Sequence, residues 1–403
     1  MKQRLESLDA LRGMDLLFLV AISDLVEELA EVVDTPWMAS VMECFTHKKW
    51  EGFSPWDLVM PLFMFMAGVA IPFSLEKYKK PLSPTLPQMG GSCKHLYFRL
   101  GKRVLLLWIF GMMVQGNLLA LDPNRIYLFT NTLQAIAVGY FFSAIIYLHT
   151  SWKTQIGIAV GLLLTFWGAM EWITIGGYGG GDYTPHGNLA EGIDSMVLGR
   201  FRDTAQVIDG QVVVRESYTY TWILSSLNFV VTVLSGVLAG QILKKTPSNS
   251  SLQGEGQDTK TICSFPYKGE VRRGSLLLAI GIALVALGWT WDMVHPVIKH
   301  IWTGSMVLVS SGYCFLLMGI FYLWIDCLGH NKHLTLLKVY GMNSITAYVV
   351  SHVISFRSIS KSLFFGLEQY VGDYYGFIIQ LGNVTILFLI LYILYRNKIF
   401  LRV

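Results

Sequence analysis

The sequence predicts an all-α, polytopic membrane protein with about ten transmembrane helices. Its 403 residues are 53% hydrophobic and 14% charged, whereas soluble domains carry about 25% charged residues. Apolar runs close to the roughly 20 residues that span a bilayer recur along the whole chain. These runs predict spans at 10–31, 55–75, 101–121, 126–149, 153–174, 219–243, 274–293, 301–325, 334–355 and 374–396.

The predicted spans form a single domain over residues 1–403, divided by one long polar loop. Spans 1–6 lie within 1–245 and spans 7–10 within 272–403. Residues 246–271 are rich in Ser, Gly and Gln, a composition typical of flexible linkers. A second long loop, 175–218, has a glycine cluster at 176–181. We interpret it as a flexible turn, since no predicted strand precedes it as in phosphate-binding loops.

The distribution of basic residues predicts the orientation. The termini and the loops on their side carry 22 of the 31 Lys and Arg residues, and loops rich in Lys and Arg stay in the cytoplasm. Both termini and the 246–271 loop are therefore predicted to be cytoplasmic. The first apolar run is of full span length, which indicates a retained span and not a cleaved signal peptide.

Charge and cysteine content exclude several classes of partner. The net charge is +4 and forms no basic stripe, so we expect no nucleic-acid partner. The five cysteines lack CxxC or Cys/His ligand spacing, which argues against a metal site and against a disulfide framework. The first expected partner is the lipid bilayer.

The most informative segment is 47–61, at the predicted outer start of the second span. It places His47 beside two tryptophans and the carboxylate of Asp57. Imidazole has a reference pKa near 6.5, so a histidine there could transfer a proton or attack an acyl carbon. Asp57 has two compatible interpretations. It could complete a helix cap with Ser54 and Pro55, or it could orient His47.

Polar groups inside spans need a reason, because a charge there costs about 2.5–3.5 kcal/mol on insertion scales. Asp24 is the deepest acidic residue near the outer end of the first span. It fits either a solvated helix end or an anionic site for a cationic amine. Ser344, Tyr348 and His352 follow i, i+4, i+8 spacing and form one polar stripe on the ninth span.

That stripe has two explanations, interhelical hydrogen bonding or the lining of a site near His47. The amides of Asn131 and Gln134 fit the same two explanations. Lys299, at the outer end of the seventh span, is most often an interface anchor in such a place. The residues alone therefore indicate an outward-facing polar site in a membrane protein.

Several stretches together resemble one known family. They are similar, in order, to heparan-alpha-glucosaminide N-acetyltransferases and their bacterial relatives over nearly the whole chain. The stretches are 7–13, 47–68, 133–134, 190–199, 236–240, 299–303 and 341–344 with His352. The family's active histidine lies in a His-x-x-Trp-x-Gly stretch, which matches residues 47–52.

The resemblance implies a membrane-embedded acetyltransferase, here of a bacterial inner membrane. Such an enzyme takes acetyl from cytosolic acetyl-CoA and delivers it to the amine of a glucosamine-type sugar or oligosaccharide across the membrane. Three positions depart from the family pattern. Ser23 and Ile298 stand where asparagines are expected, and Ala135 stands where an arginine is expected. These departures leave the acceptor and the CoA contacts open.

The resulting assignment of site residues is as follows. His47 would be the base or acetyl carrier, with Asp24 and Asp57 as catalytic carboxylates. Residues expected to contact the acceptor are Ser23, Trp50, Asn131, Gln134, Lys299, Tyr348 and His352. The CoA nucleotide is expected near Arg99, Arg103 and Arg273, although each of these arginines is also explained as a cytoplasmic anchor.

Two mechanisms are open at this point. His47 could take a proton from an amine that attacks acetyl-CoA directly, or it could itself be acetylated and then pass acetyl on. Because the hydrocarbon core is about 30 Å thick, we expect a funnel that brings the thioester to His47. The main alternative function is a transporter or flippase for a glycan or small amine. A structural or assembly protein and a homodimer are also left open.

Overall fold

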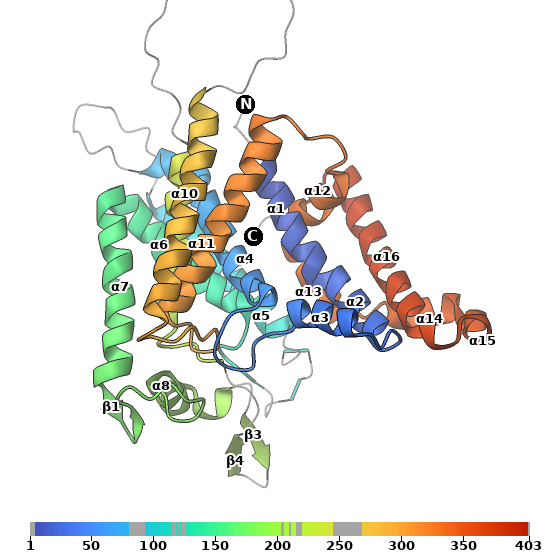
Figure 1. Ribbon diagram of the computed structural model, residues 1–403, viewed down its shortest axis with the longest axis horizontal. Helices are drawn as coiled ribbons and strands as arrows, with labels where there is room; N and C mark the ends of the chain where they lie inside the picture. Colours follow the sequence, from blue (N-terminus) through green and yellow to red (C-terminus); the bar gives the residue numbers. More distant parts are fainter. Residues whose placement is uncertain are drawn as a thin grey trace, which may run out of the picture.

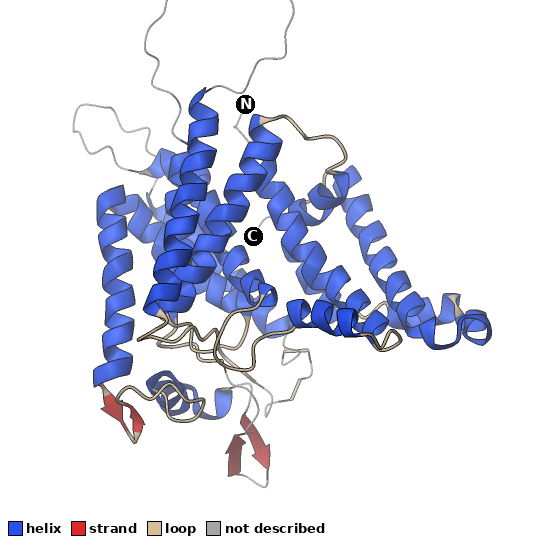
Figure 2. Cartoon of the chain, viewed as in Figure 1, coloured by secondary structure: helices blue, strands red, loops and turns tan. Residues whose placement is uncertain are grey.

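The computed structural model describes residues 5–79, 93–114, 118–119, 121–122, 126–202, 205–208, 211–214, 220–244 and 268–401. Long helices run side by side, and several short helices and two small hairpins lie at one end of them (Figure 1). Helix dominates the described chain (Figure 2). The predicted helical class is confirmed, whereas the hairpins were not predicted.

The elements of the first half are nearly all helical. The first helix is continuous through a π-helical turn at Phe18–Ile22. The helices are α1 (Glu6–Leu17), α2 (Ser23–Ala30), α3 (Pro36–Phe45), α4 (Val59–Leu75, preceded by a 3-10 turn at Pro55–Leu58), α5 (Cys93–Val114), α6 (Thr132–His149) and α7 (Trp152–Trp172).

The second half begins with the two hairpins and ends with more helices. Its elements are β1 (Thr174–Ile175), β2 (Tyr178–Gly179), α8 (Leu189–Leu198), β3 (Ala205–Ile208), β4 (Gln211–Val214), α9 (Ser226–Lys244), α10 (Lys268–Trp291), α11 (Gly304–Phe321), α12 (Thr335–Met342), α13 (Ser344–Val353), α14 (Arg357–Leu363), α15 (Glu368–Val371) and α16 (Tyr375–Arg396).

Within the described ranges, seven helices are long and apolar enough to cross a bilayer. This supports an integral membrane protein. The seven are Pro55–Tyr78, α6, α7, α9, Gly269–Trp291, Gly304–Cys327 and Phe365–Arg396. The other three predicted spans fall on α1–α2, on α5, and on α12–α13, which break at Asn343. The count of ten, the single domain and the cytoplasmic termini stay predictions.

The two long loops predicted from the sequence, 246–271 and 175–218, have different outcomes in the structure. Most of the predicted linker 246–271 lies outside the described residues, and its last four residues already belong to α10. The predicted loop 175–218 instead contains β1 to β4 and α8. Its glycine cluster forms the turn of the β1–β2 hairpin, in which Ile175 pairs with Tyr178. Gly176 and Gly177 there have φ of 60° and 90°, a conformation that glycine adopts without strain.

Helix α4 lies at the centre of the packing and contacts α9, α6, α11 and α1. Its close approach to α9 depends on glycines. A Cβ on Gly68 would lie 2.0 Å from the carbonyl oxygen of Val233, and one on Gly236 would lie 2.0 Å from that of Phe65. Gly236 and Gly240 form a GxxxG pair, a pattern that lets membrane helices approach closely.

We therefore expect Gly236→Ala to force α4 and α9 apart. Overpacking of this kind costs about 1–3 kcal/mol, so the thermal unfolding temperature of the purified protein should fall. Gly161→Ala in α7 is the matched control, because nothing lies within 4 Å of its added methyl group. Equal unfolding temperatures for the two variants would contradict this account of the α4–α9 contact.

Candidate functional site

A cavity of about 1200 Å³ runs along α4, larger than the roughly 300–1,000 Å³ of typical ligand pockets. The α4 residues that line it recur every three or four positions and so share one face of the helix. From Trp56 to Phe73 the helix rises by about 25 Å. The cavity therefore follows a length close to that of a hydrocarbon core. The lining residues of this face are Trp56 of the preceding 3-10 turn and, from α4, Val59, Met60, Phe63, Ala67, Ala70 and Phe73.

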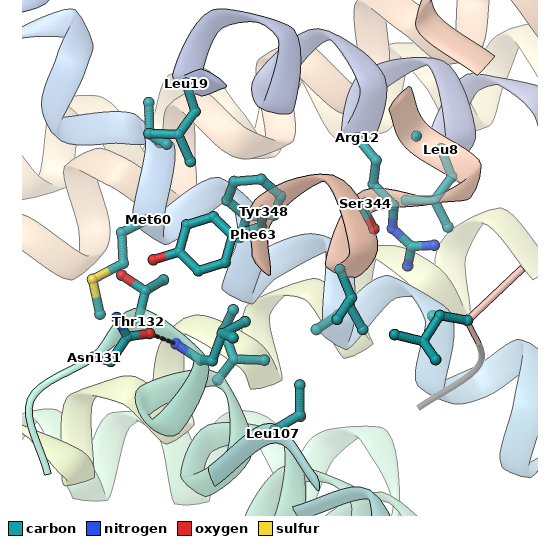
Figure 3. A pocket seen from close by; sticks show the side chains of 18 of the residues that line it. Leu8, Arg12, Leu19, Met60, Phe63, Leu107, Asn131, Thr132, Ser344 and Tyr348 are labelled. Carbon is teal, nitrogen blue, oxygen red and sulfur yellow. Dashed lines mark hydrogen bonds between the residues drawn. The ribbon is translucent and has the colours of Figure 1, made fainter. Parts of the chain in front are cut away.

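The other walls come from α1, α5, the start of α6, and α13 (Figure 3). The hydroxyl of Tyr348 points towards Thr132 and Asn131, while Arg12 reaches into the cavity near Ser344 (Figure 3). Tyr348, His352 and Asn131, all assigned from sequence to the acceptor, thus line the same cavity. The ring of His352 also contacts that of Tyr348 in a tilted arrangement, with centroids 4.4 Å apart.

Three ionisable groups meet at one end of the cavity. His47 Nδ1 lies 2.8 Å from Asp57 Oδ1, and Lys299 Nζ lies 3.3 Å from the same oxygen and 2.9 Å from Nδ1. Asp57 and Lys299 are buried, whereas the side chain of His47 is 36% exposed. His47 and Lys299 both line the cavity. Residues 10 and 252 positions apart in the chain are thereby brought together.

Asp57 performs both of the roles that the sequence left open. Its Oδ2 accepts a hydrogen bond from the backbone N–H of Ser54 at 2.9 Å, one half of the capping box that Ser54 and Asp57 form, and another from the Ser54 hydroxyl at 3.0 Å. Its Oδ1 contacts His47 and Lys299. The start of α4 therefore determines where the carboxylate lies, and the carboxylate determines how the imidazole is held.

The loop that carries Lys299 is held by hydrogen bonds to its carbonyl groups. Gly52 N–H donates to the Val297 carbonyl at 2.8 Å, Asn228 Nδ2 to that of Trp302 at 2.6 Å, and the Ser225 hydroxyl to that of Ile301 at 2.9 Å. Burial lowers the pKa of Lys299 to about 8, while the nearby Asp57 carboxylate opposes that shift. The side chain is thus a buried ammonium with one carboxylate partner at 3.3 Å.

Trp50 packs against the loop that carries Lys299. Its ring stacks on His300 at a centroid distance of 5.0 Å, and Tyr220 stacks on His300 at the same distance. Trp50 Nε1 donates to the Tyr183 carbonyl at 2.8 Å. Burial lowers the pKa of His300 to about 3, so this ring is neutral. Tyr220 lines the cavity, whereas Trp50 is not among the described residues that line it.

Three other residues assigned to the site lie elsewhere. Gln134 is buried and caps α6, with Oε1 accepting from the backbone N–H groups of Thr130 and Asn131. Asp24 accepts from the Ser23 hydroxyl at 3.2 Å and from Gln380 Nε2 at 2.8 Å. Asp24 lines a second, smaller pocket of about 200 Å³ that shares His352 with the large cavity. Neither Ser23 nor Asp24 is brought to the His47 cluster.

The predicted CoA-binding arginines separate into two groups. Arg103 lines the cavity, with its guanidinium 4.1 Å from the centroid of the Tyr140 ring. Arg99 donates to the Tyr78 hydroxyl, and Arg273 donates to the Leu243 carbonyl at 3.1 Å. Among the described residues, neither belongs to the cavity wall.

Sequence reasoning missed two cations of the cavity wall. Arg12 Nη2 donates to the Met66 carbonyl near the middle of α4, at 3.1 Å. Lys244 Nζ donates to the Pro72 carbonyl at the end of α4 far from His47, at 2.6 Å. Arg12 lies within 7–13, one of the stretches that carry the family resemblance. Lys244 is one of the 22 basic residues on the side of the termini that predict the orientation.

The chain is similar to two curated proteins. It is 25% identical to heparan-alpha-glucosaminide N-acetyltransferase of Homo sapiens and 24% identical to that of Mus musculus. This supports a distant family relationship. In both cases the similarity covers 99% of this chain and 60% of the relative, so the chain spans 60% of the length of the curated relatives it matches. No family model matches the sequence. At the level of the family, the similarity supports an acyltransferase.

We expect Asp57→Asn to destabilise the protein, because Lys299 would lose its carboxylate partner. Breaking a buried ion pair from one side costs about 3–5 kcal/mol, measurable as a lower thermal unfolding temperature. The double variant Asp57→Asn/Lys299→Met should recover part of that loss, because it removes the unpaired charge. If the two substitutions destabilise additively, the two groups are not coupled as described.

Proposed function

We propose that this protein is a transmembrane acetyltransferase of a bacterial inner membrane. It would pass acetyl from cytosolic acetyl-CoA to the amine of a glucosamine-type sugar on the opposite side. The observation that carries this proposal is the cavity along α4, which joins a basic region at one end to the His47 cluster at the other. The similarity to N-acetyltransferases over 99% of the chain points to the same chemistry.

The basic half of the cavity suits the nucleotide end of CoA. Arg12, Arg103 and Lys244 line it together with one acidic residue, Asp9, and cations are the groups that bind phosphates. Apolar side chains, among them Phe63 and Leu107, line the stretch between this region and His47. An extended pantetheine arm would fit that stretch and carry the thioester towards the imidazole.

His47 would perform the proton transfer at the other end. Nδ1 would donate its proton to the Asp57 carboxylate, and Nε2 would then be the basic nitrogen. Nε2 could take a proton from the acceptor amine while that amine attacks the thioester. It could equally attack the thioester itself and then pass acetyl to the amine. The geometry accommodates both routes.

The acceptor sugar would occupy the His47 end of the cavity. Aromatic faces and hydrogen-bonding groups gather there, a combination suited to a sugar ring with hydroxyl groups. The groups are Trp56, Tyr220, Trp222, Asn131, Tyr348 and His352. Asp24, in the adjoining small pocket, would serve a cationic part of the same acceptor, and Ser23 would act through its hydrogen bond to Asp24. A homodimer stays a prediction.

Acetyl transfer from acetyl-CoA to glucosamine, measured with purified protein, tests the function. His47→Ala should abolish transfer, because no other imidazole is held by Asp57 at this site. His330→Ala is the matched control, since this exposed histidine contacts Trp324 near the far end of α11. A protein that moves glycans across vesicle membranes without transferring acetyl would instead be the transporter considered above.

The donor end of the cavity gives a second prediction. Arg12→Gln should raise the KM for acetyl-CoA by about tenfold or more, since a hydrogen bond to a charged group contributes about 1.5–3 kcal/mol. The kcat at saturating acetyl-CoA should change little. Lys153→Gln is the control, because Lys153 is exposed at the start of α7. An unchanged KM for Arg12→Gln would remove Arg12 from the proposed donor site.

A further inference from the structure

The position of Lys299 over the imidazole of His47 carries a further inference. Lys299 Nζ lies 2.9 Å from Nδ1 and 3.4 Å from Nε2. A donor in the ring plane on the lone-pair axis of Nδ1 would be much farther from Nε2, which is on the other side of the ring. The two similar distances therefore place the ammonium over the ring face. Asp57, at 2.8 Å, is the hydrogen-bond partner of Nδ1.

The surroundings of Lys299 keep it charged near neutral pH and leave it facing the cavity. The carboxylate of Asp57 is 3.3 Å away, and the lowered pKa of about 8 still leaves the ammonium as the main form at pH 7. The neighbouring His300 is neutral, and the Tyr220 ring centroid lies 5.9 Å from Nζ. Lys299 is thus a buried positive charge beside the basic nitrogen of His47.

This charge argues against an amine-binding role for Lys299, which the sequence had assigned to the acceptor. A protonated acceptor amine would be repelled by a buried ammonium. An anion would be attracted. The anion that must form beside Nε2 in either route is the oxyanion of the tetrahedral intermediate, and donors placed in advance for such an oxyanion stabilise the transition state strongly.

We propose that Lys299 is a catalytic residue that stabilises this oxyanion; the assignment rests on the acetyltransferase function proposed above. The attacking nitrogen bonds to the thioester carbon, and the carbonyl π pair moves to oxygen beside the Lys299 ammonium. The pair returns as the C–S bond breaks and CoA leaves as thiolate. In direct transfer, His47 gives the thiolate the proton it took from the amine.

The acetyl-histidine route balances in the same way. Attack by Nε2 gives an acetylimidazolium, which loses its Nδ1 proton to solvent at the exposed side of His47 as the thiolate leaves. The products are neutral N-acetylimidazole, CoA thiolate and a proton. The acceptor amine then attacks the acetyl carbon, and a second oxyanion forms beside the same ammonium. When the C–N bond to His47 breaks, the proton of the amine restores the neutral imidazole. Lys299 thus has one role in both routes.

The test compares Lys299→Gln with Lys299→Arg, using acetyl-CoA and glucosamine at saturating concentrations. Lys299→Gln should lower kcat by about 10²–10³-fold with both KM values little changed, the pattern of a contact made in the transition state. Lys299→Arg, which keeps the charge, should restore part of kcat. Lys48→Gln, an exposed lysine beside His47, is the control. Thermal unfolding verifies that each variant is folded.

A pH profile of the wild type tests the same inference without substitution. Its kcat should fall as the pH rises through about 8, where the ammonium deprotonates, and a flat profile there would overturn the proposal. A kcat within threefold of wild type for folded Lys299→Gln, or a rise confined to the acceptor KM, would also overturn it. A wild type that transfers no acetyl at all would instead overturn the acetyltransferase function itself.

Discussion

The structure depends on keeping a buried ammonium and a buried carboxylate together at the start of α4. Removing either group from its partner would leave an unpaired charge in a site with little solvent. Several backbone features serve that pairing. The Ser54 cap places Asp57, and hydrogen bonds from Gly52, Ser225 and Asn228 hold the loop of Lys299. His47 is oriented by this pair, so its chemistry follows from how the pair is built.

Helix α4 divides two tasks between its faces. One face carries Gly68 and packs closely on Gly236 of α9, where backbone meets backbone. The other face, from Trp56 to Phe73, is left open as the cavity wall. The tight packing of α4 on α9 therefore holds the helices together while the opposite face of α4 lines an open cavity. Because both faces belong to the same rigid helix, the position of the cavity is tied to that of the His47 cluster.

Sequence reasoning predicted local features better than distant ones. Apolar runs predicted most of the helices, and the spacing of Ser54, Pro55 and Asp57 predicted the cap. The contact of His47 with Asp57 could be predicted from the sequence because only ten positions separate the two residues. The contact of Lys299 with His47, 252 positions away in the chain, depends on how the helices pack. No local sequence pattern encodes that packing. Arg12 and Lys244 were missed for the same reason, since their neighbours Met66 and Pro72 are distant in sequence.

The central claim is that one continuous path brings a CoA thioester to His47. A structure determined with an unreactive acetyl-CoA analogue, in which a ketone link replaces the thioester, tests it most directly. The account predicts the carbonyl carbon of the analogue next to His47 Nε2, and its phosphates against Arg12, Arg103 and Lys244. An analogue bound outside the α4 cavity, or one whose carbonyl stays at the basic end, would contradict it.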